Sequence, residues 1–468
     1  MSVKESFADL VIIGSGPAGQ NAAMQASKLG KSAIIIDQHS SPGGGCLFSG
    51  TIPSKSLREA ILTLTDFYKK NFYGKQEVPK EDISINDLNY CLNQVWEHQT
   101  NHFKEIFDRN NITYLQGIAH FESEKLVAVV SAEGQLLHMI HADYILIATG
   151  SVPRNPKNVP FDNECVLDST RLLKLDRVPK TMVVLGGGTI GAEYASFFAA
   201  LGTKVTVIDK RKRMLSMVDS EISFHFQQAL KDLNVTFLGE REFCSIEKRD
   251  HGVSVNFTNH PSVEAEVLLY SLGRRAAVDL LHIDKIGISL DARGYVPVNA
   301  LFQTIVPNIY AVGDVIGGPC LASTSMEQGR LAARHAFGAD THHFPTLYPV
   351  GIYTIPEISS CGYNEDELNH LGFKYEVGRA LFSEIARNII SGKDSGMFKI
   401  LFHRDTLEIL GVHIIGRQAT EMIHIGQVAM DHKAKIDYFI DQVFNYPTYA
   451  EGYRIAALNG FNKIKHKN

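Results

Sequence analysis

Two copies of one local pattern constrain the fold of this 468-residue chain more than any other feature. In each copy a short apolar run leads into a glycine-rich turn, a helix-forming stretch follows, and a second apolar run ends in an aspartate. The first copy covers 10–37 and ends at Asp37, and the second covers 182–209 and ends at Asp209. This order predicts two βαβ units, in which parallel strands flank a helix, and therefore an α/β fold.

Each turn carries three glycines at GxGxxG spacing, which is typical of a dinucleotide site. They are Gly14, Gly16 and Gly19 in the first copy, and Gly186, Gly188 and Gly191 in the second. The first glycine permits the turn, the second lets the backbone approach a pyrophosphate, and the third lets helix and strand pack closely. The helix N-terminus then stabilises the phosphate charge, and the aspartate accepts hydrogen bonds from ribose hydroxyls. One such turn also occurs for structural reasons alone, but two complete copies predict two bound dinucleotides.

The second aspartate is followed directly by two cations, Lys210 and Arg211. A carboxylate favours NAD because it repels a 2′-phosphate, whereas a guanidinium can pair with that phosphate. One interpretation is a site that accepts both NAD and NADP. The alternative, equally well supported by the sequence, is a solvated basic turn.

Composition excludes several classes of partner. Lys+Arg total 46 against 51 Asp+Glu, the net charge is −5, and the densest basic run is only 210–213, so we expect no nucleic acid and no anionic membrane partner. No apolar run reaches the roughly 18–20 residues of a membrane span, and the apolar stretch near the N-terminus is too short for a signal peptide. The six cysteines include no CxxC, which favours a reducing, cytoplasmic location.

The order of patterns along the chain predicts three domains. Residues 1–150 and 276–345 form the first dinucleotide domain, 151–275 form the second, and a composition shift after 344–345 opens a separate domain over 346–468. A polar helical region is expected over 55–110.

With these motifs the chain resembles the flavin-dependent disulfide oxidoreductase superfamily over nearly its whole length. Gly14–Gly19 resembles the FAD fingerprint of that superfamily, 148–150 its second FAD contact, and 311–314 its third, where the aspartate bonds the ribityl chain. Gly186–Gly191 resembles its nicotinamide nucleotide fingerprint. The resemblance implies two Rossmann-like domains, for FAD and NAD(P), plus a C-terminal α+β dimerisation domain that makes a homodimer or a higher homo-oligomer.

The resemblance also implies functional residues. Lys55 resembles the lysine beside the flavin, and Glu193 the acid that pairs with it. The further cofactor contacts that it implies are Gly44, Gly45, Cys46, Thr51, Ala119, Thr149, Gly150, Gly273, Gly313 and Asp314. No metal-ligand spacing is present, so no metal is expected.

Two departures from the superfamily pattern concern its thiol chemistry. Disulfide reductases carry CxxxxC where this chain has Cys46 followed by Thr51, and a hydroxyl cannot form a disulfide. The histidine base of their C-terminal His-Pro-Thr motif is Tyr446 here, and an unperturbed tyrosine with a pKa of about 10 is a poor base at neutral pH. Two related losses indicate chemistry without a redox disulfide. Cys46 is interpreted as a small buried side chain beside the flavin, and Tyr446 and Glu451 as residues that reach the flavin of the other subunit.

The loop over 43–55 and the segments 351–360 and 444–448 resemble one branch of the superfamily, the soluble pyridine nucleotide transhydrogenases. This implies ping-pong hydride transfer from NADPH to NAD through FAD, although the sequence does not determine the physiological direction. The alternative is an NAD(P)H diaphorase or electron-transfer reductase that reduces a quinone, a dye or a protein carrier. A non-catalytic flavin-bound scaffold is disfavoured by the intact cofactor motifs, and a disulfide reductase by the missing thiol groups.

Overall fold

The computed structural model describes residues 4–65, 83–392 and 395–465. The chain forms two compact units, each assembled from three segments. Unit 1 comprises Met1–Ser56, Tyr90–Arg154 and Gly273–Pro345, and unit 2 comprises Leu57–Asn89, Asn155–Leu272 and Thr346–Asn468. The helical region expected over 55–110 contains α3 (Thr51–Leu64) and α4 (Ile85–Arg109), and its part over 66–82 lies outside the described residues.

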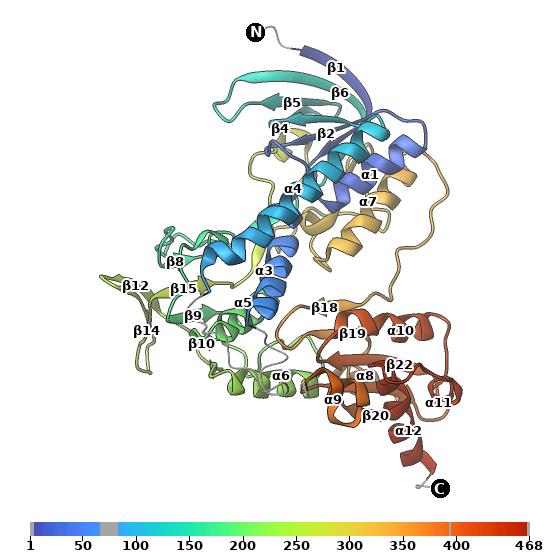
Figure 1. The fold of residues 1–468 in the computed structure, drawn as a ribbon. Helices are drawn as coiled ribbons and strands as arrows, with labels where there is room; N and C mark the ends of the chain where they lie inside the picture. Colours follow the sequence, from blue (N-terminus) through green and yellow to red (C-terminus); the bar gives the residue numbers. More distant parts are fainter. Residues whose placement is uncertain (1–3, 66–82, 393–394, 466–468) are drawn as a thin grey trace. The chain divides into compact units, whose positions relative to one another are not determined.

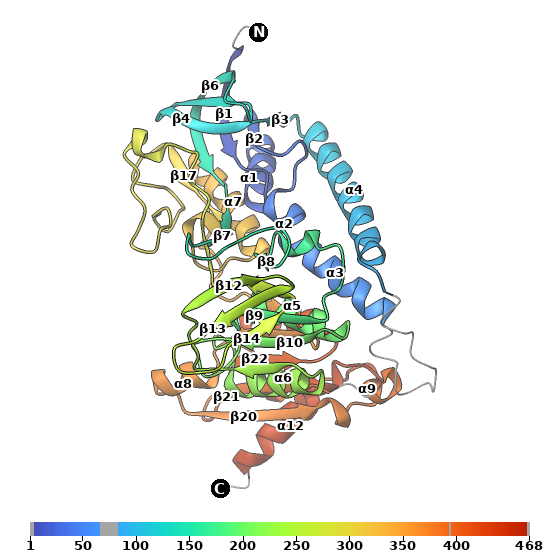
Figure 2. The ribbon, with the colours of Figure 1, turned by 90° about the vertical axis from the view of Figure 1, so that its left-hand side faces the viewer.

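Unit 1 is built on a seven-stranded sheet of order β3-β2-β1-β6-β5-β4, with β17 also paired to β6. Figure 1 labels β5 of this sheet, and Figure 2 labels β3 and β17. The pairs β1–β2, β2–β3, β1–β6 and β6–β17 are parallel, whereas β4, β5 and the first half of β6 form an antiparallel meander. The strands are β1 (Lys4–Ile13), β2 (Ala33–Asp37), β3 (Thr113–Gln116), β4 (Ile118–Ser123), β5 (Leu126–Val130), β6 (Leu136–Ile147) and β17 (Ile309–Ala311).

The two faces of this sheet bury alternate residues of β1, as the two-residue period of a strand requires. Leu10 and Ile12 pack in the cluster that includes α1 (Pro17–Lys28) and α7 (Ala322–Ala336), whereas Val11 and Ile13 pack in the cluster formed with β4 and β5. Helix α1 begins at a proline, whose fixed φ and missing N–H suit the first helical turn. Short elements of this unit include α2 (Gly44–Phe48), β7 (Ser151–Pro153) and β16 (Arg274–Ala276), the last two paired antiparallel.

The first part of unit 2 is a second parallel sheet, of order β11-β10-β9-β15-β8 (Figure 2). Its strands are β8 (Val166–Leu167), β9 (Thr181–Leu185), β10 (Lys204–Ile208), β11 (Thr236–Leu238) and β15 (Val267–Tyr270), and its helices are α5 (Thr189–Ala200) and α6 (Ser220–Asp232). A small antiparallel sheet accompanies it, with β12 (Ser245–Arg249), β13 (Gly252–Asn256) and β14 (Val263–Ala265). Both predicted βαβ units are thus confirmed, one in each unit.

The C-terminal part of unit 2 is an antiparallel sheet of order β18-β19-β22-β21-β20, with α10, α11 and α12 contributing to one apolar cluster with it. The strands are β18 (Val350–Ile352), β19 (Ile358–Gly362), β20 (Tyr375–Leu381), β21 (Met397–His403) and β22 (Ile409–Ile415). The helices are α8 (Glu365–Leu371), α9 (Ala386–Ser391), α10 (Ala419–Asp431), α11 (Asp437–Asp441) and α12 (Glu451–Lys465). This arrangement confirms the expected α+β region. Among the helices that the structure describes, none is long and apolar enough to cross a bilayer.

Candidate active site

The first glycine-rich turn joins β1 to α1, and each of its glycines has a distinct steric reason. Gly14 has a φ of 110°, and a Cβ there would lie 2.3 Å from the carbonyl oxygen of Ala148. A Cβ on Gly19 would lie 2.0 Å from the carbonyl oxygen of Gly14, so a side chain would push α1 away from the turn. A Cβ on Gly16 would meet no described atom within 4 Å, and Gly16 is the N-cap of α1 without a capping side chain among the described residues. The helix start is therefore open to an anionic ligand.

Asp37 ends β2 beside this turn, and its carboxylate has four hydrogen-bond contacts. Oδ2 accepts from the backbone N and the hydroxyl of Ser15 at 2.8 and 2.7 Å, and Oδ1 accepts from the backbone N of His39 at 3.0 Å and pairs with its Nδ1 at 2.8 Å. Burial raises the pKa of Asp37, but the bonds from His39 and Ser15 outweigh it, so the pKa is lowered. An ionised carboxylate thus stands at the predicted ribose contact. His39 was not among the predicted site residues, and its place two residues after the acid is the only signal for it in the sequence.

A second group of predicted contacts follows the carboxyl ends of β6 and β17, which are parallel neighbours. The Oγ1 of Thr149 is buried, and no described atom hydrogen-bonds to it. Asp314 Oδ2 accepts a hydrogen bond from Ser151 Oγ at 2.7 Å. Ser151 Oγ in turn accepts one from Arg274 Nε, also at 2.7 Å. An orphaned hydroxyl, an anchored carboxylate and the open helix start line the same sheet edge, which fits an extended dinucleotide such as FAD. Arg274 was not predicted from the sequence.

Ala119 and Gly273 were predicted as further cofactor contacts. Ala119 lies in β4, where it is buried in the apolar cluster of the sheet. Gly273 precedes β16 and has a φ of 107°. For both, contact with a cofactor stays a prediction.

The loop with the single cysteine packs against the first turn, since a Cβ on Gly44 would lie 2.7 Å from the Cα of Gly16. Gly45 and Cys46 follow in α2, and the Cys46 thiol lies within hydrogen-bonding reach of the Thr51 hydroxyl. Burial raises the pKa of the Cys46 thiol, and the Thr51 hydroxyl and the Lys55 charge only partly oppose this. All six cysteines are free. The thiol is thus protonated at neutral pH and has no sulfur partner.

Lys55 and Glu193 were predicted to pair beside the flavin. Lys55 lies on α3 within unit 1 and donates to Ser54 Oγ at 3.2 Å. Glu193 lies buried on α5 within unit 2, and its Oε1 accepts from the backbone N of Tyr353 at 2.9 Å. Because the two residues belong to different units, their pairing stays a prediction.

The segment that begins at Tyr353 is held by further polar contacts within unit 2. Ser196 Oγ, one turn after Glu193 on α5, accepts from the backbone N of Ile355 at 3.0 Å. Arg58 on α3 donates from Nε to the carbonyl of Thr354 at 3.2 Å and from Nη2 to Glu357 Oε1 at 2.8 Å. These contacts fix the backbone that orients Glu193. Arg58 was missed because its partners lie about 300 residues away in the sequence.

The second glycine-rich turn, between β9 and α5, repeats the geometry of the first. Gly186 has a φ of 105°, and a Cβ on Gly191 would lie 1.8 Å from the Gly186 carbonyl oxygen. Gly188 is the N-cap of α5, and no described side chain caps the helix. This helix start is again suited to phosphate.

Asp209 ends β10 and is covered by Arg211. The guanidinium donates from Nε to Oδ1 at 2.9 Å and from Nη2 to Oδ2 at 2.6 Å. Oδ1 also accepts from the backbone N of Arg211 at 2.8 Å, and Oδ2 from that of Gly187 at 2.6 Å. Burial raises the pKa of Asp209, but the bonds from Arg211 and Gly187 outweigh it and lower the pKa. Lys210 is exposed.

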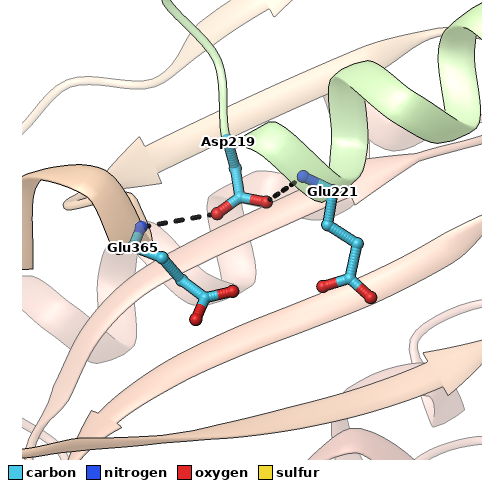
Figure 3. A group of neighbouring side chains, drawn as sticks. All are labelled: Asp219, Glu221 and Glu365. Atoms are coloured by element: carbon cyan, nitrogen blue, oxygen red, sulfur yellow. Dashed lines mark hydrogen bonds between the residues drawn. The ribbon is translucent and has the colours of Figure 1, made fainter. Parts of the chain in front are cut away.

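A buried charged cluster in unit 2 has no counterpart in the sequence predictions. Asp219, Glu221 and Glu365 each place a carboxylate oxygen within 4.8 Å of the others, and Figure 3 shows Asp219 accepting from the backbone N of both glutamates. The Nζ of Lys399 forms an ion pair with all three, and its side chain is 0% exposed. The ammonium therefore supplies the cation that these carboxylates surround. The one signal in the sequence was a lysine inside the apolar run of β21.

Tyr446 and Glu451 lie near the C-terminus. Tyr446 is 72% exposed, and Glu451 is the first residue of α12. Their predicted contact with the flavin of a second subunit stays a prediction.

Comparisons with known proteins agree over the full length. Residues 8–329 match the family described as pyridine nucleotide-disulphide oxidoreductase, and 348–457 match the dimerisation domain of that family. A Mycobacterium bovis protein named soluble pyridine nucleotide transhydrogenase is 44% identical over 460 residues, covering 98% of each chain. A Vibrio cholerae protein of the same name is 42% identical over 468 residues, covering 99% of this chain and 100% of the relative.

Solved structures show the same fold. The HOCl-induced flavoprotein disulfide reductase RclA from Escherichia coli has a TM-score of 0.86 at 27% identity, covering 96% of this chain and 99% of that one. LpdA from Mycobacterium tuberculosis has a TM-score of 0.87 at 24% identity, covering 97% of this chain and 99% of that one.

Proposed function

The chain belongs to the family of pyridine nucleotide-disulphide oxidoreductases, and we propose that it is a FAD-dependent soluble pyridine nucleotide transhydrogenase. The reaction is ping-pong transfer of a hydride from NADPH to NAD, without a redox disulfide. The observation that carries this proposal is the identity of 44% and 42%, over nearly the whole chain, to relatives of that name.

The chemistry of the cysteine loop supports the proposal independently. A disulfide reductase passes electrons through two sulfurs, and here the position of the second is Thr51, whose hydroxyl cannot be oxidised to a disulfide. The raised pKa of Cys46 keeps the remaining thiol protonated. Tyr446 stands in place of a histidine base. The chain therefore has no thiol route for electrons, although its nucleotide sites are intact.

In unit 1, FAD would be held by the first glycine-rich turn, by Asp37 and by the residues that follow the carboxyl ends of β6 and β17. The N-terminus of α1 binds the pyrophosphate, Asp37 accepts from the ribose, and Asp314 accepts from the ribityl chain while Ser151 orients it. When bound, FAD supplies a two-electron carrier that takes a hydride from one nicotinamide and gives it to another. Lys55 places an ammonium charge that stabilises negative charge on the reduced ring.

In unit 2, the N-terminus of α5 binds the pyrophosphate of NADPH or NAD, and the Asp209–Arg211 pair meets the adenosine ribose. Glu193 is oriented by the backbone N–H of Tyr353 and acts as a positioning residue for the nicotinamide end. The family dimerisation domain over 348–457 supports a homodimer, and six free cysteines favour the cytoplasm.

Stopped-flow absorbance on the FAD-loaded protein tests the proposal. NADPH should bleach the flavin, and NAD or its thio-analogue, added second, should restore the flavin colour at a rate that matches turnover. If NAD leaves the flavin reduced while a quinone or dye reoxidises it, the chain is instead an NAD(P)H diaphorase, and the transhydrogenase proposal is wrong.

A further inference from the structure

A buried arginine on α3 supports an inference that rests on the proposed function and deepens it. Arg58 follows Lys55 by one helical turn, and its side chain is only 3% exposed. We propose that Arg58 is a positioning residue for hydride transfer: it holds the backbone of residues 353–357, and through that backbone it keeps the Glu193 carboxylate in the orientation that serves the nicotinamide.

The first step of the argument concerns what orients Glu193. This residue is buried on α5, and its Oε1 accepts from the backbone N of Tyr353 at 2.9 Å. A peptide group is planar, so its N–H cannot turn as a side chain does and points where the chain directs it. A displacement of the 353–357 segment therefore moves the donor that the Glu193 carboxylate meets.

The second step concerns how the 353–357 segment is held between two helices. The backbone N–H groups of Tyr353 and Ile355 donate to side chains of α5, at 2.9 and 3.0 Å. The residue between them, Thr354, accepts at its carbonyl from Arg58 Nε on α3, at 3.2 Å. The segment is thus fixed by α5 through two donors and by α3 through an acceptor, and Arg58 supplies the α3 contact.

The third step concerns the far end of the segment. Arg58 Nη2 donates to Glu357 Oε1 at 2.8 Å, while Glu357 Oε2 accepts from the backbone N and the hydroxyl of Thr420 at 3.3 and 2.9 Å. A guanidinium is planar and its donors have a fixed geometry. One rigid group therefore sets the positions of the Thr354 carbonyl and the Glu357 carboxylate together.

Apolar packing separates this positioning from the attachment of α3. Ala60 and Ile61 of α3 lie in one buried cluster with Ile352 and Ile355, and the same cluster includes side chains of α5. This burial does not involve the guanidinium, so α3 should stay docked when Arg58 is replaced. What is lost is the fixed path of the 353–357 segment, and with it the orientation of Glu193.

The test compares R58M with the matched control E59Q in FAD-loaded protein. Glu59 is 69% exposed and accepts from Arg58 Nη1 at 2.6 Å, so E59Q weakens the solvent side of the guanidinium and leaves its contacts with the 353–357 segment in place. In stopped flow, R58M should lower the rate constant of flavin bleaching at saturating NADPH about 10- to 100-fold. The apparent dissociation constant of NADPH should change less than about 2-fold, because a misplaced positioning group costs rate rather than binding. E59Q should behave as the parent does.

Hydrogen exchange of the backbone amides provides a readout that does not depend on activity. R58M should speed exchange at Tyr353 and Ile355 about 10-fold, because their hydrogen bonds to α5 open more often when the segment is released from α3. E59Q should leave both amides as protected as in the parent. R58K keeps the charge but not the paired donors, so both its exchange and its bleaching rate should lie between those of R58M and the parent.

A purely structural role of Arg58 would give a different result. Fewer folded molecules would lower the amplitude of bleaching and leave its rate constant unchanged. That outcome, a parental rate constant in R58M, or an equal slowing in E59Q overturns the proposal. If R58M does not fold, S196A tests the same segment from α5, because Ser196 Oγ is the acceptor for Ile355 N. Exchange at Ile355 should then speed up and the rate constant should fall at least 3-fold, and parental values of both overturn the proposal.

The two proposals fail in different ways. Bleaching by NADPH is common to a transhydrogenase and a diaphorase, so the result for Arg58 does not depend on whether NAD or a quinone reoxidises the flavin. A parent flavin that NADPH does not bleach refutes the proposed function. A parent that is bleached, together with an R58M protein that is bleached at the same rate, refutes the inference about Arg58 alone.

Discussion

Replacing Lys399 with methionine tests how unit 2 is held together. Methionine has a similar length and fills the same space without the charge. In the parent protein the ammonium pairs with Asp219 at 2.8 Å, with Glu221 at 2.9 Å and with Glu365. The Asp219 side chain is fully buried, and those of the two glutamates are partly buried. The variant leaves the buried Asp219 beside the two glutamates, which keep only the Arg379 guanidinium, 2.7 Å from Glu221 and 3.9 Å from Glu365.

The expected loss of stability follows from that geometry. Carboxylate oxygens 4.8 Å apart repel each other by about 3.5 kcal/mol at an effective dielectric constant near 20. Removing one partner of a buried ion pair generally costs about 3–5 kcal/mol. The repulsions do not simply add, because a crowded carboxyl takes up a proton instead. We therefore expect K399M to unfold with a free energy about 3–5 kcal/mol lower than the parent at pH 7.

The loss of stability in K399M should depend on pH. Burial raises the pKa values of Asp219 and Glu221, but His413 and Lys399 near Asp219, and Arg379 and Lys399 at Glu221, outweigh it, so both pKa values are lowered in the folded parent. Their contribution is therefore present above the unfolded pKa of about 4 and is lost as the pH falls below it. Without Lys399, burial raises the folded pKa of Asp219 above its unfolded value, whereas Glu221 keeps its pair with Arg379. The variant therefore loses stability as the pH rises towards 7. The difference between the two proteins should shrink from pH 7 to pH 5.

Denaturant unfolding of FAD-loaded protein at both pH values measures this difference. The control is K285M, which removes an exposed pair with Glu122 at 2.9 Å and should cost less than about 1 kcal/mol at either pH. The reasoning is refuted if K399M loses less than about 1 kcal/mol at pH 7, or if its loss is the same at pH 5.

Three further predictions follow from the two nucleotide sites. In G191A the added Cβ would lie 1.8 Å from the Gly186 carbonyl oxygen. Flavin reduction by NADPH should therefore fall at least 100-fold in stopped flow, while the FAD content is unchanged. Loss of FAD as well would contradict a role of Gly191 confined to unit 2. In S151A the Asp314 carboxylate loses the hydroxyl at 2.7 Å, so FAD should dissociate about 5- to 15-fold more readily by fluorescence, and an unchanged dissociation constant would show that Ser151 does not orient Asp314. In the parent protein, NADPH should expose no additional thiols to a thiol reagent, because Cys46 has no sulfur partner; two new thiols per chain would restore the disulfide reductase hypothesis.

The sequence predicted the two turns well because their determinants are local. The expected strand over 204–208 is β10, and the expected helices start at the glycines that N-cap α1 and α5. The first strand was predicted only from Leu10, whereas β1 begins at Lys4, because the residues before Leu10 are mostly exposed or half-buried and are held by pairing with the first half of β6. That pairing depends on a partner more than 100 residues away, which no local pattern reveals.

Among the site residues, too, those with local determinants were predicted and those that depend on distant contacts were not. Asp37 and Asp209 were identified from their position after a strand, but the residues that hold them, His39 and Arg211, differ in chemistry although they occupy the same place in the turn. Arg211 was only one of two interpretations of a basic run, and its contact with Asp209 became evident from the side-chain geometry. Lys399 was not predicted at all, because an isolated lysine in an apolar strand acquires its meaning from three distant carboxylates.

The loss of the second sulfur illustrates why this fold can change chemistry without changing shape. Thr51 is close to cysteine in size, and its hydroxyl lies within reach of the Cys46 thiol, so α2 and the start of α3 keep their contact without a disulfide. The uncapped starts of α1 and α5 are formed by the two glycine-rich turns, and neither turn contains Cys46 or Thr51. A chain that loses the thiol pair can therefore keep both glycine-rich turns and their open helix starts, so that the fold retains its nucleotide-binding geometry while its thiol chemistry is lost.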